Sequence, residues 1–343
     1  MELPVRIARE TAGERVISVD GAWGAPGLNL SHWPGHRTPD ELRHDLSTGS
    51  ALRFARLPDA RRRELAAGCT SIVNNHFDTD GTCALFAVRH PGRALELEDE
   101  LLDAARAGDL FGFPNERAFV VDRIVTGLSD AQSSPIASEL RGLADDERST
   151  RATLHLLEAL PAILRGDVEP YRESWERELE RVKLDLAALS RCARDDVAHL
   201  DWTAWVAKPG SFESGRDPGR HALFGASQHD RALVAIPESG GTRYRFVINT
   251  TSWFDLVTRS ALPRPDLAAL AARLNDLEGT RGSDAVAWRA QATGSPSPEL
   301  WFGTAEHELF AEHCTSMRES SLTLPQVRRA LAEAQRAALA LPE

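Results

Sequence analysis

The chain has 343 residues, of which 42% are hydrophobic and 27% charged, and its formal net charge is −11. This composition is that of a globular protein long enough for two domains, and it excludes a disordered chain and a membrane-embedded one. The negative charge argues against a long nucleic-acid duplex as partner, because binding to its phosphates requires concentrated Lys and Arg.

The start of the chain and its cysteines indicate a compartment. Met1 to Pro4 lack the basic and apolar regions of a signal peptide, and no hydrophobic run approaches the length of a membrane span. The four cysteines are scattered without a Cys-x-x-Cys pair, which is typical of reduced thiols rather than of a disulfide framework or a zinc ribbon. We therefore expect a cytoplasmic protein that makes no contact with a membrane.

The first half of the chain alternates between strand and helix patterns. Arg15–Asp20 is typical of a strand, and Thr38-Pro39-Asp40-Glu41 has the spacing of a capping box that begins a helix. A helix is predicted over Pro58–Ala67, a buried strand over Ser71–Val73 and a further strand over Ala94–Glu98. This alternation predicts a parallel-sheet α/β domain over residues 1–165.

Three amphipathic patterns follow, at Glu116–Leu128, Thr150–Leu164 and Glu173–Leu189. The last of these is charged on its outer faces. It is interpreted either as part of a helical connector over residues 166–200 or as an interface in a homo-oligomer.

The last part of the chain predicts a smaller α+β domain over residues 201–343. Ala232–Ile236 and Arg243–Ile248 flank a Pro/Gly turn, as the strands of a hairpin do. A helix over Leu267–Leu277, a strand over Ala285–Ala290 and a terminal helix capped by Thr323 and Gln326 complete the pattern.

The polar turn after Ser71–Val73 is where the sequence indicates chemistry. His76, Asp78 and Asp80 alternate along a segment expected to be extended, so their side chains would converge at the carboxyl end of a parallel strand. Gly81 would allow a sharp turn into a helix whose amino end suits an anion. The pattern indicates a metal cation together with a phosphate, although Asp-x-Asp-Gly also occurs as an ordinary solvated turn.

The segment His76-x-Asp78-x-Asp80-Gly81 resembles the first motif of the DHH phosphoesterase superfamily. The resemblance covers about twenty residues and implies that His76, Asp78 and Asp80 bind Mn²⁺ or Mg²⁺. The Asp-His-His motif of that superfamily and its Gly-Gly-Gly-His signature are absent from this sequence. The resemblance therefore leaves the donors of a second metal position unassigned.

Other residues are candidates for that second position and for acid–base chemistry. Asp109, Asp99 and Asp20 each lie where a strand or a helix is expected to end, where a carboxylate could bind metal or serve as an ordinary cap. His32 lies beside Trp33 in a Pro/Gly loop and is interpreted as a catalytic base or pocket wall, or as part of a loop packed on a sheet edge. We assign His32 and Asp109 as catalytic candidates and His76, Asp78, Asp80 and Asp109 as metal ligands.

Two functions follow as hypotheses. The first is a Mn²⁺- or Mg²⁺-dependent hydrolase, a phosphoesterase acting on a small phosphorylated, anionic substrate. The second is a non-catalytic ligand-binding or regulatory protein that retains a degenerate metal and anion site. Basic residues of the C-terminal part could bind the substrate anion, whereas the alternating Arg243 and Arg245 are interpreted as the solvent side of the hairpin.

Overall fold

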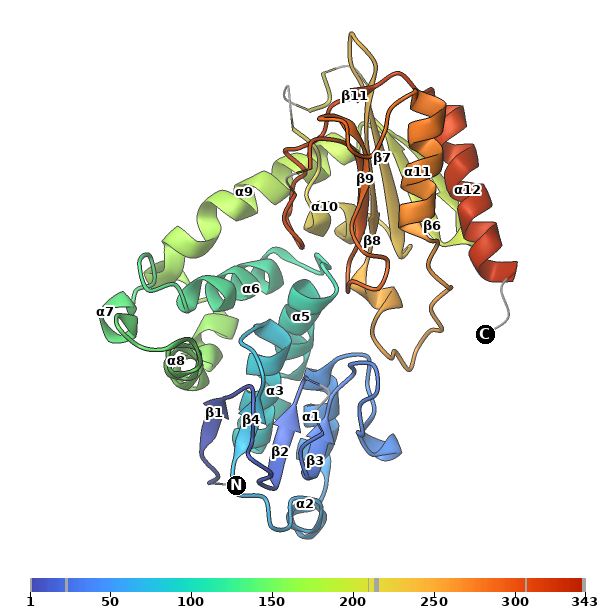
Figure 1. Cartoon of the computed structure of the whole chain (residues 1–343). Coiled ribbons are helices and arrows are strands. Elements are labelled where there is room, and N and C mark those ends of the chain that lie inside the picture. Colours follow the sequence, from blue (N-terminus) through green and yellow to red (C-terminus); the bar gives the residue numbers. More distant parts are fainter. Residues whose placement is uncertain (1, 22–23, 209, 213–215, 306, 341–343) are drawn as a thin grey trace. The chain divides into compact units, whose positions relative to one another are not determined.

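The computed structural model describes residues 2–21, 24–208, 210–212, 216–305 and 307–340. Its residue contacts form two compact units (Figure 1). Unit 1 comprises Met1–Glu180 and Phe254–Arg259, and unit 2 comprises Arg181–Trp253 and Ser260–Glu343. The division between Glu180 and Arg181 lies inside the predicted connector, 166–200.

Unit 1 contains a parallel four-stranded sheet, as predicted. Its strands lie in the order β1 (Val5–Ile7), β4 (Ile72–Asn74), β2 (Val16–Val19) and β3 (Gly27–Leu30). Strand β4 pairs in parallel with β1 on one side and with β2 on the other, so the predicted interior strand is confirmed. All residues of β2 and β4 are buried, in keeping with their mostly β-branched sequences, which Ser18 and Asn74 interrupt.

Helices make up the rest of unit 1 (Figure 1). They are α1 (Ser47–Arg56), α2 (Asp59–Leu65), α3 (Thr79–Arg89), α4 (Pro91–Leu95), α5 (Glu98–Asp109), α6 (Glu116–Leu128), α7 (Ala137–Leu140), α8 (Asp145–Arg165) and the 3-10 helices η1 (Asp40–Leu42) and η2 (Glu169–Tyr171), followed by α9 (Arg172–Leu189), within which the units divide. Helix α3 is buried from Thr79 to Val88. Burial raises the pKa of the Cys83 thiol well above its usual range, consistent with a packing role for this residue.

Two elements predicted for unit 1, a strand and a capping box, are wrong. Ala94–Glu98 is not a strand, because α4 ends at Leu95 and α5 begins at Glu98; its alternating Ala, Leu and Glu are also good helix formers. The predicted capping box at Thr38 is followed only by η1, and the long helix α1 begins at Ser47. The Thr38 hydroxyl does not cap, since it accepts from the Ser31 amide and donates to the Ser31 carbonyl (both 2.8 Å).

Unit 2 is built on a mixed seven-stranded sheet. Along it lie β5 (Ala193–Val197), β6 (Trp202–Val206), β7 (Arg231–Pro237), β8 (Thr242–Ile248), β10 (Glu299–Gly303) and β9 (Ala287–Ala290), and β11 (Glu319–Ser320) also pairs with β8. Strands β6 and β7 are parallel, whereas β7 and β8 form the predicted antiparallel hairpin.

The helices of unit 2 are η3 (Ala198–Leu200), α10 (Arg220–Gly225), η4 (Thr250–Ser252), α11 (Leu267–Glu278) and α12 (Leu324–Ala340). Helices α11 and α12 lie against one face of the sheet (Figure 1), where Leu270, Leu274 and Leu331 join the buried core. Asp266 caps α11 by accepting from the amides of Ala268 and Ala269 (both 3.0 Å). The α/β fold class predicted from the sequence is therefore confirmed.

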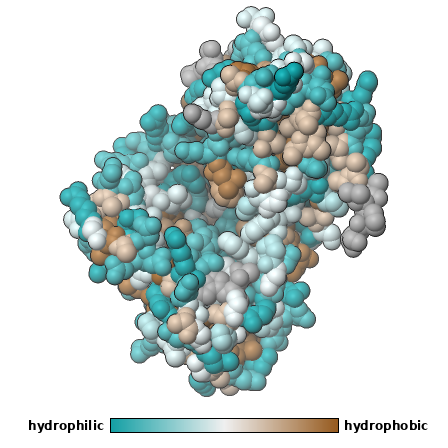
Figure 2. All heavy atoms as spheres, viewed as in Figure 1, coloured by the Kyte–Doolittle hydropathy of each residue, from teal (hydrophilic) through white to brown (hydrophobic). Residues whose placement is uncertain are grey.

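On the face drawn in Figure 2, hydrophilic residues predominate and hydrophobic residues form separate patches. Among the described helices, none combines the length and the hydrophobicity that crossing a membrane requires.

Candidate metal centre

Asp20 directly follows β2 and lies at the centre of the site. Its backbone has a φ of +61°, a left-handed conformation that Asp tolerates better than most residues. Oδ1 accepts from the indole Nε1 of Trp33 (3.1 Å) and from the hydroxyl of Ser47 (3.0 Å). Oδ2 is buried and lies 3.1 Å from Nε2 of His76, with which it forms an ion pair when His76 is protonated. Hydrogen bonds therefore fix Oδ1 in place, whereas Oδ2 faces His76 and could bind a cation when His76 is neutral.

His32, just beyond β3, is fully buried and has a defined tautomer. Its Nδ1 lies 2.6 Å from the carbonyl oxygen of Asp45, and because a carbonyl only accepts, Nδ1 carries the proton. Nε2 then faces carboxylate oxygens of Asp109 (3.0 Å), Asp80 (3.6 Å) and Asp20 (3.7 Å). A nitrogen lone pair and carboxylate oxygens at these separations require a proton or a metal cation between them.

Asp109 is the last residue of α5, and its side chain is 8% exposed. Burial, together with the charges of Asp78, Asp80 and Asp20, raises the pKa of Asp109 well above its usual range. This direction favours a proton on Asp109 when no cation is bound. A divalent cation would displace it, because metal ligands must be deprotonated.

Asp80 has two roles in the fold. Its carboxylate accepts from the backbone amides of Ser47 (2.7 Å) and Thr48 (2.8 Å), which are the first residues of α1. The prediction that Asp80 continues an extended segment is wrong, because α3 begins at Thr79 and turns Asp80 toward α1. Burial is the main cause of the raised pKa of Asp80, and the charge of Asp20 adds to it.

His76 and Asp78 form the more open part of the site. Asp78 caps α3 through Oδ1, which accepts from the Gly81 amide (2.9 Å), and its Oδ2 lies 3.0 Å from Nε2 of His76. The side chains of His76 and Asp78 are 36% and 28% exposed. Burial alone would lower the pKa of His76, but the charges of Asp78 and Asp20 outweigh it and raise this pKa well above its usual range.

These residues form two donor groups that share Asp20. The inner group is Asp20, His32, Asp80 and Asp109, and the outer group is Asp20, His76 and Asp78; within each, donor atoms lie within 4.8 Å of one another. Carboxylate oxygens and imidazole nitrogens suit Mn²⁺, and the oxygens also suit Mg²⁺. The positions of Asp20 Oδ2, 3.1 Å from Nε2 of His76, and of His32 Nε2, 3.0 Å from Asp109, fit the same interpretation.

The structure brings all five assigned residues, His32, His76, Asp78, Asp80 and Asp109, into these groups. Among the other carboxylates considered, it includes Asp20 but not Asp99, which is exposed in the first turn of α5. The sequence did not single out Ser47, which donates to Asp20, or Phe254, whose ring stacks on that of His32. No pattern links these residues to the acidic turn, because their contacts arise only in the folded chain.

A third donor group, Glu299, His307 and Cys314, lies in unit 2. Arg220 and Arg245 already pair with Glu299, and burial raises the pKa of Cys314 to about 12. This group is therefore poorly suited to a metal. The prediction that Arg243 and Arg245 face solvent is wrong, since they are 5% and 0% exposed. Arg243 pairs with Glu238, and Arg245 pairs with the buried carboxylates of Asp217 and Glu299.

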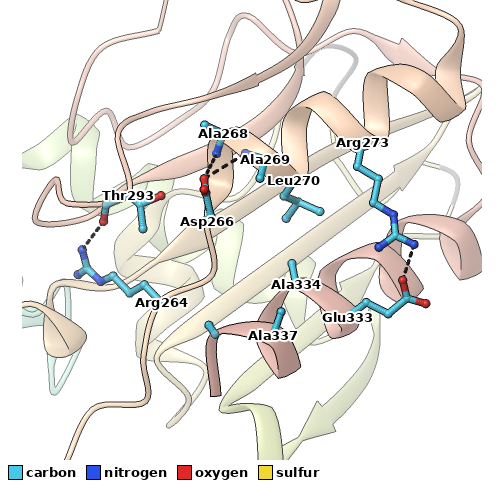
Figure 3. Close-up of a pocket in the computed structure, with 11 residues that line it drawn as sticks. Arg264, Asp266, Ala268, Ala269, Leu270, Arg273, Thr293, Glu333, Ala334 and Ala337 are labelled. Carbon is cyan, nitrogen blue, oxygen red and sulfur yellow. Dashed lines mark hydrogen bonds and ion pairs between the residues drawn. The ribbon is translucent and has the colours of Figure 1, made fainter. Parts of the chain in front are cut away.

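A cavity of about 700 Å³ lies between α11 and α12 of unit 2 (Figure 3). Five of its eleven lining residues are alanine. Its charged side chains already have partners: Asp266 caps α11, Arg273 pairs with Glu333, and Arg264 donates to the carbonyl of Thr293. The cavity therefore lacks the convergent polar groups of a catalytic site.

Comparison with known proteins bears on the chain as a whole. No curated protein matches the sequence. Residues 4–343 match the family described as "Family of unknown function (DUF6687)", and the chain belongs to that family.

Proposed function

We propose that this protein is a metal-dependent hydrolase that cleaves a phosphoester of a small anionic substrate, with Mn²⁺ or Mg²⁺ at the inner and outer groups. The observation that carries the proposal is the position of Asp20, whose Oδ1 lies 3.7 Å from Nε2 of His32 and whose Oδ2 lies 3.1 Å from Nε2 of His76. A carboxylate shared by two donor groups is suited to a pair of metal ions acting on one phosphate.

Bound metal would lower the pKa of a water molecule and neutralise phosphate charge. The residues of the chain supply the rest. Trp33 and Ser47 fix Oδ1 of Asp20, so this carboxylate needs little reorganisation. His76 and Asp78 are the exposed donors, and a substrate therefore approaches from their side. Without cations, the carboxylates of both groups would repel an anionic phosphate.

One observation favours a second function. Both oxygens of Asp80 already accept amide hydrogens from α1, so the inner group also has a structural task. A protein that binds one ion to stabilise this junction, and a ligand without cleaving it, would be the regulatory alternative. The absence of an Asp-His-His motif agrees with that alternative.

The test combines calorimetric titration of Mn²⁺ and Mg²⁺ with phosphate release from a panel of nucleotides and sugar phosphates. Wild type, Asp20→Asn and Asp185→Asn are compared; Asp185 is a buried carboxylate in unit 2 that accepts from the Gly219 amide (2.9 Å). Metal-dependent phosphate release that is lost in Asp20→Asn and kept in Asp185→Asn supports the hydrolase. Metal binding without release from any substrate supports the regulatory alternative, and absence of metal binding in the wild type refutes both.

A further inference from the structure

The segment Phe254–Arg259, called the strap below, belongs to unit 1 although it is distant from the rest of that unit in sequence. The chain enters it after η4 and leaves it before α11, both of which are elements of unit 2. A short segment that leaves its neighbours in sequence to pack on another unit needs specific contacts to hold it. These contacts converge on His32.

Phe254 covers one face of the His32 ring. The two ring centroids are 3.8 Å apart and the planes are inclined by 17°, a stacked arrangement. The amide of Asp255 donates to the backbone carbonyl of His32 (2.8 Å), which fixes the strap beside the same residue. Phe254 is 8% exposed and His32 is 0% exposed. The stack therefore restricts the orientation of the imidazole.

Asp45 connects the strap to the second constraint on His32. Its carboxylate accepts from the amides of Val257 (2.6 Å) and Thr258 (3.0 Å) and from the Thr258 hydroxyl. Its backbone carbonyl accepts from Nδ1 of His32 (2.6 Å). One residue thus anchors the strap through its side chain and sets the His32 tautomer through its backbone.

We infer that the strap closes the inner group: Phe254 and Asp45 are positioning residues that hold His32 against an ion and slow the exchange of that ion with solvent. The inference rests on the proposed function, because it requires the inner group to bind metal. The side chains of Asp20, His32 and Asp80 are 0% exposed and that of Asp109 is 8% exposed. An ion held among them reaches solvent only when a covering element moves, and the strap is the cover on the side of His32.

The test is the rate at which Mn²⁺ leaves loaded protein after mixing with excess chelator, followed by the paramagnetic resonance of the released ion. We expect two phases in the wild type: fast release from the outer group and slow release from the inner group. Phe254→Leu removes the stacking ring, and Asp45→Ala removes the strap anchor while leaving the carbonyl that binds His32. Each variant is expected to accelerate the slow phase by about 10-fold or more, the size typical of lost support for a metal ligand, and to leave the fast phase unchanged.

Tyr171→Leu is the matched control, since Tyr171 is also 8% exposed and lies edge-on to a histidine, His155 (centroids 6.2 Å apart). Thermal midpoints measured for all proteins allow variants of equal stability to be compared. A slow phase unchanged in both strap variants, or accelerated equally in Tyr171→Leu, overturns the inference even though the wild type binds metal. If the wild type binds no Mn²⁺, the proposed function itself fails.

Discussion

Replacement of Asp20 by Asn distinguishes a shared metal ligand from an ordinary buried acid. Asn keeps an oxygen that accepts from Trp33 and Ser47, so the local hydrogen bonds survive. It removes one negative charge from a cluster that also contains Asp78, Asp80 and Asp109. Because these carboxylates repel one another when metal is absent, we expect the metal-free variant to unfold at the same temperature as the wild type or at a higher one.

The size of the effect follows from ligand linkage. Loss of a residue that hydrogen-bonds to a metal ligand typically lowers metal affinity about 10- to 100-fold. Loss of a charged ligand itself should therefore lower metal affinity at least about 100-fold. At a Mn²⁺ concentration of about 100 times the wild-type Kd, bound ion stabilises the wild type by about 2.7 kcal/mol and such a variant by about 0.4 kcal/mol. For a unit of this size the thermal midpoint should rise by roughly 5 to 10 °C in the wild type and by roughly 1 to 2 °C in the variant.

The assay is differential scanning fluorimetry with and without Mn²⁺, beside calorimetric counting of bound ions. Asp185→Asn serves as the control for removal of a buried carboxylate and should keep the wild-type shift. If Asp20→Asn lowers the metal-free midpoint by several degrees while retaining the full Mn²⁺ shift, Asp20 is a structural residue. In that case the two groups do not share a ligand.

Three further predictions follow from individual contacts. Asp78→Asn should weaken only the outer group, leaving one of two calorimetric binding events, because Asn can still cap α3 and the inner donors are untouched. Asp80→Ala should lower the unfolding free energy of the metal-free protein by about 1 to 2 kcal/mol, because two backbone amides of α1 lose their acceptors. Relief of repulsion among the remaining carboxylates would make this loss smaller. Urea titration measures it, and an unchanged midpoint would contradict the structural role of Asp80. Although burial opposes it, the charges of Arg245 and Arg220 hold the pKa of Glu299 well below its usual range. Ionised Glu299 therefore stabilises the folded state at pH values above its unfolded pKa of about 4.3, and this contribution is lost as the pH falls through the folded pKa. Glu299→Gln should lower the unfolding free energy by about 3 to 5 kcal/mol at pH 7 and weaken the dependence of that free energy on pH in the acid range.

The sequence predicted the parts of the fold whose patterns are local. The β-branched run at β4, the hairpin of β7 and β8 and the amphipathic spacing of α6 each depend on a few adjacent residues. The strand predicted at Ala94–Glu98 failed because alternating Ala, Leu and Glu are equally compatible with the helices that packing selects there. The predicted capping box at Thr38 does not form, because the Thr38 hydroxyl bonds the backbone amide and carbonyl of Ser31 instead. That contact depends on the loop between β3 and η1.

The site was predictable in composition but not in its division into groups. Alternation suggested that His76, Asp78 and Asp80 share one face, whereas α3 begins between Asp78 and Asp80 and separates them. Asp20 was one of several equivalent carboxylates in the sequence. It becomes central only because parallel strands bring the ends of β2, β3 and β4 to one edge. Arg245 was misassigned to solvent because its partners Asp217 and Glu299 are far from it in sequence.

The difference in exposure between the two groups implies a division of labour. The inner group offers three carboxylates and one imidazole, nearly all buried, and one of those carboxylates also joins α1 to α3. An ion there would be tightly held and would remove a repulsion that the fold otherwise carries. The outer group offers two carboxylates and one imidazole, and its His76 and Asp78 are open to solvent. A cation at the outer group would keep open coordination positions for a substrate oxygen and a water molecule. Turnover should therefore depend on the outer group and stability on the inner one.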